Sequence, residues 1–246
     1  KEEQIHIVDQ CLEFNFKVFT VPLITNWENQ KDISQKIKNI QIEDLLERKP
    51  IVLDDKSITK QLKDKTVLIT GAAGSIGSEI VRQVLTFKPK VILMLDQAET
   101  PLHQLTLETQ ALATDTIIYS VIADVRSKKA MESVFATYQP QVVYHAAAYK
   151  HVPLMEENPA QAIVTNVKGT KNVADLSCKY GVAKFVMVST DKAVNPSNVM
   201  GASKRIAEKY VQSLQWKHKK EHSDVVTKFI TTRFGNVLGS NGSVVP

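Results

Sequence analysis

The most informative stretch of this sequence is Thr66-Val-Leu-Ile-Thr-Gly-Ala-Ala-Gly-Ser-Ile-Gly77, an apolar run that ends abruptly in glycines. A helical pattern follows at once and extends from Ser75 to Phe87. The start of a helix presents unpaired N–H groups and the positive end of the helix dipole, and both attract phosphate. We therefore predict a strand that leads into a phosphate-binding loop made of Gly71, Gly74, Ser75, Ile76 and Gly77.

The three glycines recur at every third position, and each suits a different task. Gly71 permits a sharp turn, Gly74 lets a pyrophosphate approach bare backbone, and Gly77 allows the helix to pack closely on the strand. The next strand, Lys90-Val-Ile-Leu-Met-Leu-Asp96, ends in a carboxylate. A βαβ dinucleotide-binding fold places a carboxylate here, where it binds the hydroxyls of the adenosine ribose. The sequence therefore predicts a Rossmann-type domain.

From residue 65 onwards, strand patterns and helix patterns alternate. Strands are expected at 66–70, 90–96, 116–122, 141–145, 184–189 and 225–232, and helices at 75–87, 100–113, 127–137, 158–180 and 197–220. This alternation predicts an α/β fold with a doubly wound parallel sheet in the strand order 3-2-1-4-5-6. Ligands of such sheets bind at the carboxyl ends of the strands.

The first part of the chain departs from this pattern. Residues 1–60 hold a helical pattern (Ile5, Val8, Leu12) and the short strand 16–23, but no loop motif. We expect them to be the tail of a preceding α/β domain plus a connector at residues 40–50. Pro50 and a turn at Asp54-Asp55-Lys56 predict a boundary near residue 60. Residues 61–246 are then the NAD(P)-binding Rossmann core, preceded by a small α/β appendage.

Composition narrows the classes of partner. The chain has 246 residues, of which 43% are hydrophobic and 23% charged, which suffices for one full core and a smaller appendage. The formal net charge of +5 favours an anionic ligand. The basic residues are scattered and only 7% of the residues are aromatic, so we expect a nucleotide and no nucleic acid.

Cysteine use and hydropathy indicate the compartment. Cys11 and Cys178 are far apart and lack the spacing to histidines that a zinc site has, so we expect no metal site and no disulfide framework. No run of eighteen apolar residues and no signal peptide is present. We therefore expect a cytoplasmic segment that neither spans a membrane nor is exported.

Two further strand ends carry candidate cofactor contacts. Asp124, followed by Val125, either caps the next helix or contacts the adenine amino group, and the sequence favours neither. Ala146-Ala147-Ala148 either pack against a helix or leave room for a dinucleotide to lie flat, and their place after a strand favours the cofactor. His145 precedes them, and we assign it no role, because a lone histidine at a strand end is more often hydrogen-bonded in place.

Polar side chains concentrate in residues 188–205, after the fifth strand. Met200 and Lys204 are four residues apart and hence on one face of a helix. In short-chain dehydrogenases that face carries Tyr-x-x-x-Lys, in which Lys binds ribose hydroxyls and lowers the pKa of Tyr. Lys204 is therefore a candidate contact of the cofactor.

Four motifs together resemble the extended short-chain dehydrogenase family: Thr-Gly-x-x-Gly-x-x-Gly, His-Ala-Ala-Ala-Tyr-Lys-His-Val-Pro-Leu-Met-Glu, Ser-Thr-Asp-Lys-Ala-Val-Asn-Pro and Arg-Phe-Gly-Asn-Val-Leu-Gly-Ser. From about residue 40 to its end, the chain more closely resembles the bacterial UDP-N-acetylglucosamine 4,6-dehydratases of capsule, O-antigen and protein-glycan synthesis. The resemblance implies a UDP-sugar substrate, with Lys150 and Asn236 as contacts.

The same resemblance implies an acid and a base in the segment after the fifth strand. In that family hydride leaves sugar C4 for the nicotinamide, water is eliminated across C5–C6, and the hydride returns to C6. Carried over, Asp191 protonates the departing C6 hydroxyl, Lys192 takes the C5 proton, and Thr190 hydrogen-bonds the C4 oxygen.

Met200 departs from most of the superfamily, which has its catalytic Tyr at this position. A thioether cannot take or give a proton. Long, membrane-anchored dehydratases resemble this sequence in having Met there. The base for the C4 hydroxyl stays open between Thr190 relaying to water and Asp191 acting twice.

We also state expectations for the identity of the cofactor and for the segments that flank this chain. Asp96 would repel a 2′-phosphate and Gln97-Ala98 supply no cation, so NAD is expected, with NADP as the alternative. By resemblance, upstream membrane helices and a first α/β domain would precede residues 1–60, and roughly a hundred residues that close over the substrate would follow residue 246. A homo-oligomer is expected.

Two other functions remain as alternatives. A nucleotide-sugar 4-epimerase needs no acid–base pair for C5 and C6, so the presence of Asp191 and Lys192 favours the dehydratase. A non-catalytic dinucleotide-binding module would fit Met200, but the acid–base segment weighs against it.

Overall fold

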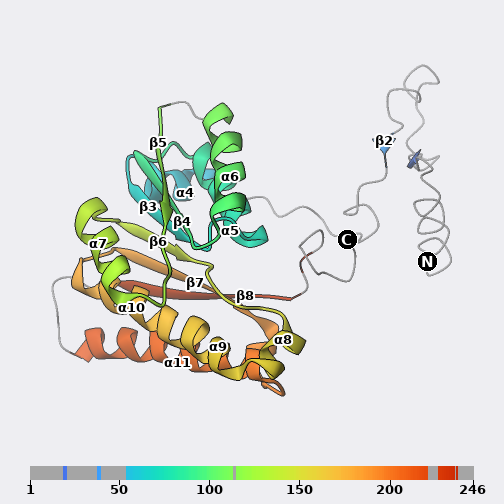
Figure 1. The fold of residues 1–246 in the computed structure, drawn as a ribbon. Coiled ribbons are helices and arrows are strands. Elements are labelled where there is room, and N and C mark those ends of the chain that lie inside the picture. Colours follow the sequence, from blue (N-terminus) through green and yellow to red (C-terminus); the bar gives the residue numbers. More distant parts are fainter. Residues whose placement is uncertain are drawn as a thin grey trace, which may run out of the picture. The chain divides into compact units, whose positions relative to one another are not determined.

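Figure 1 shows the computed structural model of the chain. It describes residues 54–112, 115–220, 227–235 and 237, together with two short strand segments at 19–20 and 38–39. The chain separates into two compact units, Lys1–Leu53 and Asp54–Pro246. In the first unit, β1 (Phe19–Thr20) pairs antiparallel with β2 (Lys38–Asn39). The helix expected near Ile5 and the connector at 40–50 lie outside the described residues.

The second unit is built around a parallel sheet. Among the described residues it has six strands: β3 (Thr66–Thr70), β4 (Val91–Asp96), β5 (Ile117–Ile122), β6 (Val142–His145), β7 (Lys184–Thr190) and β8 (Lys228–Phe234). Their order is β5-β4-β3-β6-β7-β8, and every neighbouring pair is parallel. Counted along the chain, this is the order 3-2-1-4-5-6, so the predicted doubly wound Rossmann sheet is confirmed.

Helices cover both faces of this sheet (Figure 1). One face carries α4 (Asp55–Leu62), α5 (Ser75–Thr86) and α6 (Glu99–Leu112). The other face carries α7 (Lys128–Tyr138), α10 (Thr170–Lys179) and α11 (Val199–Lys220). Between the end of β6 and α10 lie the short helices α8 (Val152–Glu157) and α9 (Pro159–Ala162) and the π-helix η3 (Ile163–Gly169).

The central strands β3 and β4 are apolar on both sides because both faces of the sheet are covered there. Leu68 and Leu93 pack into the cluster on the α7, α10 and α11 side, whereas Val67, Ile69 and Ile92 pack into the cluster on the α4, α5 and α6 side. All five side chains are fully buried. The packing of helices on both faces fixes the ends of the strands, and these ends position the site.

The structure corrects two local expectations and adds one helix. The turn predicted at Asp54-Asp55-Lys56 is wrong, because Asp54 caps α4 by accepting hydrogen bonds from the Ser57 backbone N–H and hydroxyl. Leu62 of α4 is buried in the core. The helix expected over 158–180 consists of α9, η3 and α10, and α8 was not expected at all. Pro153 and Pro159 sit in the first turns of α8 and α9, where a missing N–H is tolerated.

Within the described part of the chain, no helix combines the length and the apolar character that a membrane crossing requires.

Candidate functional site

Two adjoining pockets lie along the carboxyl ends of the strands. The first, here called the β4–β5 pocket, is lined by residues that follow β3, β4, β5 and β6 and by Thr165 of η3. The second, here called the β7–β8 pocket, has a volume of about 590 Å³, a size typical of small-molecule sites. The residues shared by the two pockets are Gly71, Gly74, Ala146, Ala148 and Tyr149.

The glycine-rich loop separates β3 from α5. Gly71 has a φ of +67°, and a Cβ on it would lie 2.5 Å from the Ala147 backbone nitrogen. A Cβ on Gly77 would lie 1.9 Å from the Gly71 carbonyl oxygen, so only glycine fits there. A Cβ on Gly74 would come no closer than 3.4 Å to that same oxygen, and the residue faces both pockets. Gly71 thus makes the turn, Gly77 allows the close approach of helix and strand, and Gly74 presents an open face. Ser75 and Ile76 line the β7–β8 pocket.

Asp96 ends β4 and lines the β4–β5 pocket. One carboxylate oxygen accepts a hydrogen bond from the Ala73 backbone nitrogen at 3.0 Å, and the other accepts one from the Ala98 backbone nitrogen at 3.0 Å. Asp96 therefore ties the glycine-rich loop to the end of β4. Each oxygen keeps a further lone pair for a ligand hydroxyl.

Asp124 lies beside Val125 in the same pocket. Its carboxylate accepts hydrogen bonds from the Arg126 backbone nitrogen at 2.8 Å and from Arg126 Nε at 2.6 Å. The bond from the Arg126 side chain lowers the pKa of Asp124. The capping alternative for Asp124 is wrong, since Ser127 caps α7.

Arg126 is a residue that sequence reasoning missed. Its guanidinium donates to Gln97 Oε1 at 3.4 Å and to Gln161 Oε1 at 3.2 Å, besides its bonds to Asp124. A cation therefore lies next to Gln97, although the sequence around Gln97 supplies none. Gln97 and Gln161 are distant from Arg126 in sequence, so no local signal points to these two contacts.

The β4–β5 pocket can be tested for its fit to a dinucleotide. Thr165 Oγ1 is buried and finds no hydrogen-bond partner among the residues that the structure describes, although it lines this pocket. Such an atom calls for a polar ligand or water. The small side chains of Ala146-Ala147-Ala148 also line the pocket. Together with the open face of Gly74, these features fit a nucleotide with a pyrophosphate.

His145 is fully buried at the end of β6. Thr70 Oγ1 lies 2.7 Å from its Nδ1, and Thr170 Oγ1 lies 2.9 Å from its Nε2. Burial, with a smaller contribution from the Lys204 charge, lowers the pKa of His145 to about 3. The expectation that His145 is hydrogen-bonded in place is confirmed.

Thr190, Asp191 and Lys192 form a connected group at the end of β7 and in the short 3-10 helix η4 (Asp191–Ala193). Asp191 Oδ1 accepts hydrogen bonds from Thr190 Oγ1 at 2.9 Å and from Lys192 Nζ at 3.3 Å. The bond from Thr190, followed by that from Lys192, lowers the pKa of Asp191. Thr190 and Lys192 line the β7–β8 pocket, whereas the Asp191 side chain is 57% exposed beside it.

Met200 and Lys204 lie one turn apart on α11, and both are buried at the wall of the β7–β8 pocket. Lys204 Nζ donates a hydrogen bond to the Val188 carbonyl oxygen at 2.7 Å. Burial lowers the pKa of Lys204 to about 8, and the negative charge of Glu208 acts in the opposite direction. Met200 packs in a small apolar cluster with Met155 and Ala162.

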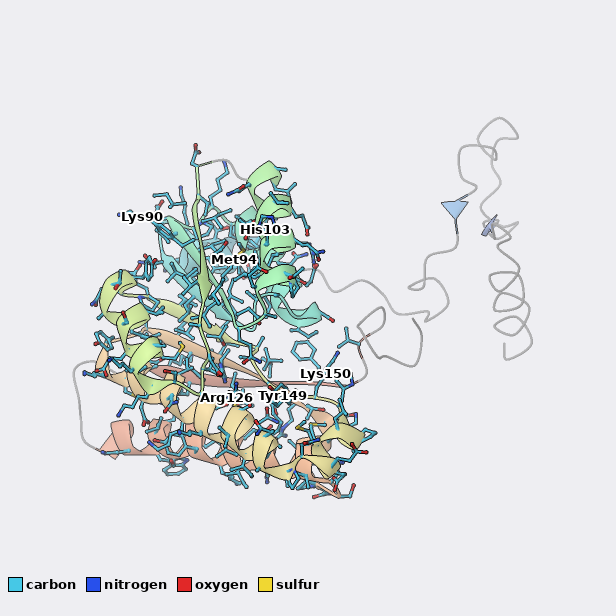
Figure 2. All side chains as sticks on the ribbon, viewed as in Figure 1. Lys90, Met94, His103, Arg126, Tyr149 and Lys150 are labelled. Atoms are coloured by element: carbon cyan, nitrogen blue, oxygen red, sulfur yellow. The ribbon has the colours of Figure 1, made fainter. Side chains whose placement is uncertain are left out.

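Tyr149 and Lys150 reach the β7–β8 pocket from the loop after β6, and Figure 2 labels both beside the start of α8. The buried amide of Asn166 holds this loop: Oδ1 accepts from the Tyr149 backbone nitrogen at 2.8 Å, and Nδ2 donates to the Tyr149 carbonyl oxygen at 3.0 Å. Sequence reasoning missed Asn166. Asn236, expected as a substrate contact, lies outside the described residues.

Over the part of the chain that the structure describes, no group of three or more His, Cys, Asp and Glu side chains is arranged to hold a metal ion.

Comparison with known proteins places this arrangement in a family. The family model described as "Polysaccharide biosynthesis protein" matches residues 67–246. The "Probable polysaccharide biosynthesis protein EpsC" of Bacillus subtilis (strain 168) is 48% identical over 212 residues, which are 86% of this chain and 34% of that protein. A "UDP-N-acetylglucosamine 4,6-dehydratase (inverting)" of Campylobacter jejuni is 39% identical over 184 residues, which are 74% of this chain and 52% of that protein.

Solved structures agree with this. The X-ray structure of Pen from Bacillus thuringiensis is 37% identical, with a TM-score of 0.68, and the match covers 74% of this chain and 53% of that one. A UDP-glucose 4-epimerase of Thermus thermophilus in complex with NAD is 26% identical, with a TM-score of 0.59, and the match covers 71% of this chain and 56% of that one.

The chain spans between about a third and about half of the length of these curated relatives. The resemblance read from the motifs is confirmed by the family model, by the relatives and by the Rossmann sheet. The chain belongs to the polysaccharide biosynthesis protein family, whose members share the extended short-chain dehydrogenase fold with nucleotide-sugar dehydratases and epimerases.

Proposed function

We propose that this chain is the catalytic core of a nucleotide-sugar 4,6-dehydratase that converts UDP-N-acetylglucosamine to UDP-4-keto-6-deoxy-N-acetylhexosamine. One observation carries the proposal: Thr190 and Lys192 both hydrogen-bond Asp191 Oδ1 at the edge of the β7–β8 pocket. Elimination of water needs an acid and a base within reach of one sugar ring. An epimerisation at C4 needs neither at C5 or C6.

The cofactor of this proposal is NAD. The open face of Gly74 and the start of α5 would receive the pyrophosphate, Asp96 the adenosine ribose, and Lys204 the second ribose. When bound, the nicotinamide supplies the reversible oxidation at sugar C4. The NAD held by the Thermus epimerase supports this choice.

The charges beside the adenosine site argue for NAD over NADP. The carboxylates of Asp96 and Asp124 line the β4–β5 pocket, and Asp124 already pairs with Arg126. A 2′-phosphate would therefore meet an excess of negative charge. Calorimetry with the two cofactors tests this, and tighter binding of NADP would overturn the assignment.

The chain's own residues supply the proton transfers. Because its pKa is lowered, Asp191 is ionised at neutral pH and can accept the C4-hydroxyl proton through Thr190 Oγ1, to which it is bonded at 2.9 Å. Asp191 then holds the proton that the departing C6 hydroxyl requires. Lys192, as the neutral amine, takes the proton from C5, which the neighbouring ketone has made acidic, and returns a proton to C5 when the hydride returns to C6. Of the two bases left open by the sequence, the ionised Asp191 acting twice is the one that we propose.

Met200 takes no part in the proton transfers. Its thioether can move no proton, and its side chain is buried with Met155 and Ala162. We propose that it shapes the apolar wall of the β7–β8 pocket beside Lys204.

The proposal can be extended to the complete protein. On the resemblance stated above, we propose that this core lies on the cytoplasmic side of a longer, membrane-anchored homo-oligomer and that Lys150 and Asn236 contact the UDP-sugar. The residues before α4 would be the end of a preceding α/β domain with its connector, and further residues would close the substrate side.

The proposal is tested by incubating the complete protein with UDP-N-acetylglucosamine and NAD and following the sugar by NMR. A 4-keto-6-deoxy product is expected. Conversion to UDP-N-acetylgalactosamine would favour the epimerase alternative, which the similarity to the Thermus 4-epimerase supports. Cofactor binding without turnover of any UDP-sugar would favour the binding module.

A further inference from the structure

Glu208 is a fully buried carboxylate one helical turn after Lys204 on α11. Both of its oxygens are engaged. Oε1 accepts a hydrogen bond from Arg233 Nε at 2.9 Å, and Oε2 accepts one from Arg233 Nη2 at 2.7 Å and one from Arg205 Nη1 at 3.4 Å. A buried carboxylate is costly unless it is paired in this way. The proposed chemistry does not use Glu208, so its burial needs another explanation.

The pair formed by Glu208 and Arg233 joins two walls of the β7–β8 pocket. Arg233 lies in β8, and the two residues after it, Phe234 and Gly235, line that pocket. Lys204 lines the same pocket from α11. The ion pair therefore joins α11, one turn after Lys204, to the carboxyl end of β8.

The surroundings of Lys204 are poor in charges that stabilise its ammonium group. Burial works against the charged form, and Glu208 works for it. His145 on the β6 side is neutral at physiological pH, because burial lowers its pKa to about 3. Lys192 on η4 and Arg233 on β8 are cations, and Asp191 is bonded to Thr190 and Lys192.

The charged side chains on the other elements that pack against α11 either bind partners other than Lys204 or are exposed to solvent. Glu156 of α8 accepts a hydrogen bond from the Val199 backbone nitrogen at the start of α11. Lys168 of η3 is exposed, and Asp175 of α10 pairs with Lys171. Lys184 of β7 donates to Gln61 at the opposite end of its strand. Glu208 is thus the anion placed to act on Lys204.

We propose that Glu208 is a positioning residue that stabilises the protonated form of Lys204 at the wall of the β7–β8 pocket. The importance of that charge for cofactor binding rests on the proposed function, in which the Lys204 ammonium donates to ribose hydroxyls. A merely structural tie between α11 and β8 would be broken equally from either side. An electrostatic role predicts opposite results for the two sides.

The experiment titrates Lys204 by NMR of ¹³Cε-lysine in this chain, with the Lys204 signal assigned by its absence in Lys204→Arg. Wild type is compared with Glu208→Gln and Arg233→Gln. In Glu208→Gln we expect the titration midpoint to fall by about one pH unit, because the stabilising anion is gone. In Arg233→Gln we expect it to stay or rise, because the anion remains and a cation is lost. Glu132→Gln, which breaks the exposed pair with Lys179, is the control and leaves the midpoint unchanged.

The double variant Glu208→Gln/Arg233→Gln keeps the test decisive should Glu208→Gln alone not fold, because no unpaired charge is left buried. Its Lys204 midpoint should lie below that of Arg233→Gln, since these two differ only in the charge of Glu208. Equal midpoints in these two variants, or in wild type and Glu208→Gln, would overturn the proposal.

A second readout is the affinity for NAD as a function of pH. Affinity should weaken as pH rises through the Lys204 midpoint, and in Glu208→Gln this weakening should occur about one pH unit lower. A wild-type chain that binds no NAD at any pH would count against the proposed function. The NMR titration would still decide the role of Glu208.

Discussion

At the scale of the residue, Thr190 and Lys192 share one hydrogen-bond acceptor, Asp191 Oδ1, and the proposed catalytic roles of the three residues rest on this arrangement. In the mechanism that we propose, Thr190 and Asp191 serve the C4 hydroxyl first, and Lys192 serves C5 afterwards. The two steps should therefore be separable by substitution.

In the complete protein, Lys192→Ala should still form the 4-keto sugar and reduced cofactor but lose the exchange of the C5 hydrogen with heavy water. The expected loss of exchange and of 6-deoxy product is about a hundredfold to ten-thousandfold, the usual size for one positioned acid–base group. Absorbance of the reduced cofactor and NMR of the sugar measure the two steps. Exchange at the wild-type rate would mean that Lys192 is not the base, and failure to form the keto sugar would place Lys192 before elimination.

The glycine-rich loop gives a second residue-scale prediction. Gly74→Val should abolish NAD binding while leaving the fold intact, because a Cβ there meets only one atom, at 3.4 Å, and the rest of the side chain enters the pyrophosphate position. Gly77→Ala should instead lower the free energy of unfolding by about 1–3 kcal/mol, because its Cβ would overlap the Gly71 carbonyl. Calorimetry with NAD and thermal unfolding separate the two effects. Near wild-type affinity in Gly74→Val would show that the loop does not hold the cofactor.

Several site residues could be predicted from sequence because their signals are local. The spacing of Gly71, Gly74 and Gly77 and the acid at the end of β4 needed no knowledge of distant contacts. Arg126, Asn166 and Glu208 could not be predicted, because Gln97, Tyr149 and Arg233 are 29, 17 and 25 residues away from them. Only folding brings these partners together.

At the scale of the element, the π-helix η3 is the departure that matters for the site. It follows α9 without a break and presents Asn166 to Tyr149 and to Ser203 of α11, whose Oγ accepts from Asn166 Nδ2 at 2.9 Å. Single π-helical turns are frequent at functional sites. Sequence periodicity predicted one α-helix over 158–180, since a widened turn leaves the apolar face nearly unchanged.

Asn166→Ala should lower the free energy of unfolding by about 2–4 kcal/mol, because it leaves buried polar partners on two elements unpaired. Denaturant unfolding measures this. Asn158→Ala is the matched control, because Asn158 is exposed and its side chain makes one bond, to the Leu154 carbonyl. A loss no larger than that of the control would contradict the role of Asn166 in holding the Tyr149 loop.

At the scale of the molecule, the alternation of strands and helices was sufficient to predict the sheet and its order. A parallel sheet with both faces covered leaves continuous apolar runs such as Val91–Leu95, and the crossover rule allows few strand orders. The short helix α8 was not predictable from periodicity, because six residues are too few to show a helical repeat.

The chain spans about half of the Campylobacter dehydratase, and we propose that further residues close the substrate side. Residues 1–246 alone should therefore bind NAD but turn over little UDP-N-acetylglucosamine, because water exclusion is incomplete. Calorimetry and a product assay, each run beside the complete protein, check this. Turnover by the chain alone at the rate of the complete protein would contradict it.

The most direct test of the dehydratase assignment is to run the complete protein with UDP-N-acetylglucosamine and NAD in heavy water and to locate deuterium in the product by NMR. With Asp191 as the acid and Lys192 as the base, as we propose, the product should be a 4-keto-6-deoxy sugar with solvent deuterium at C5. A product inverted at C4 that keeps its C6 hydroxyl and its original C5 hydrogen would contradict the assignment and identify an epimerase.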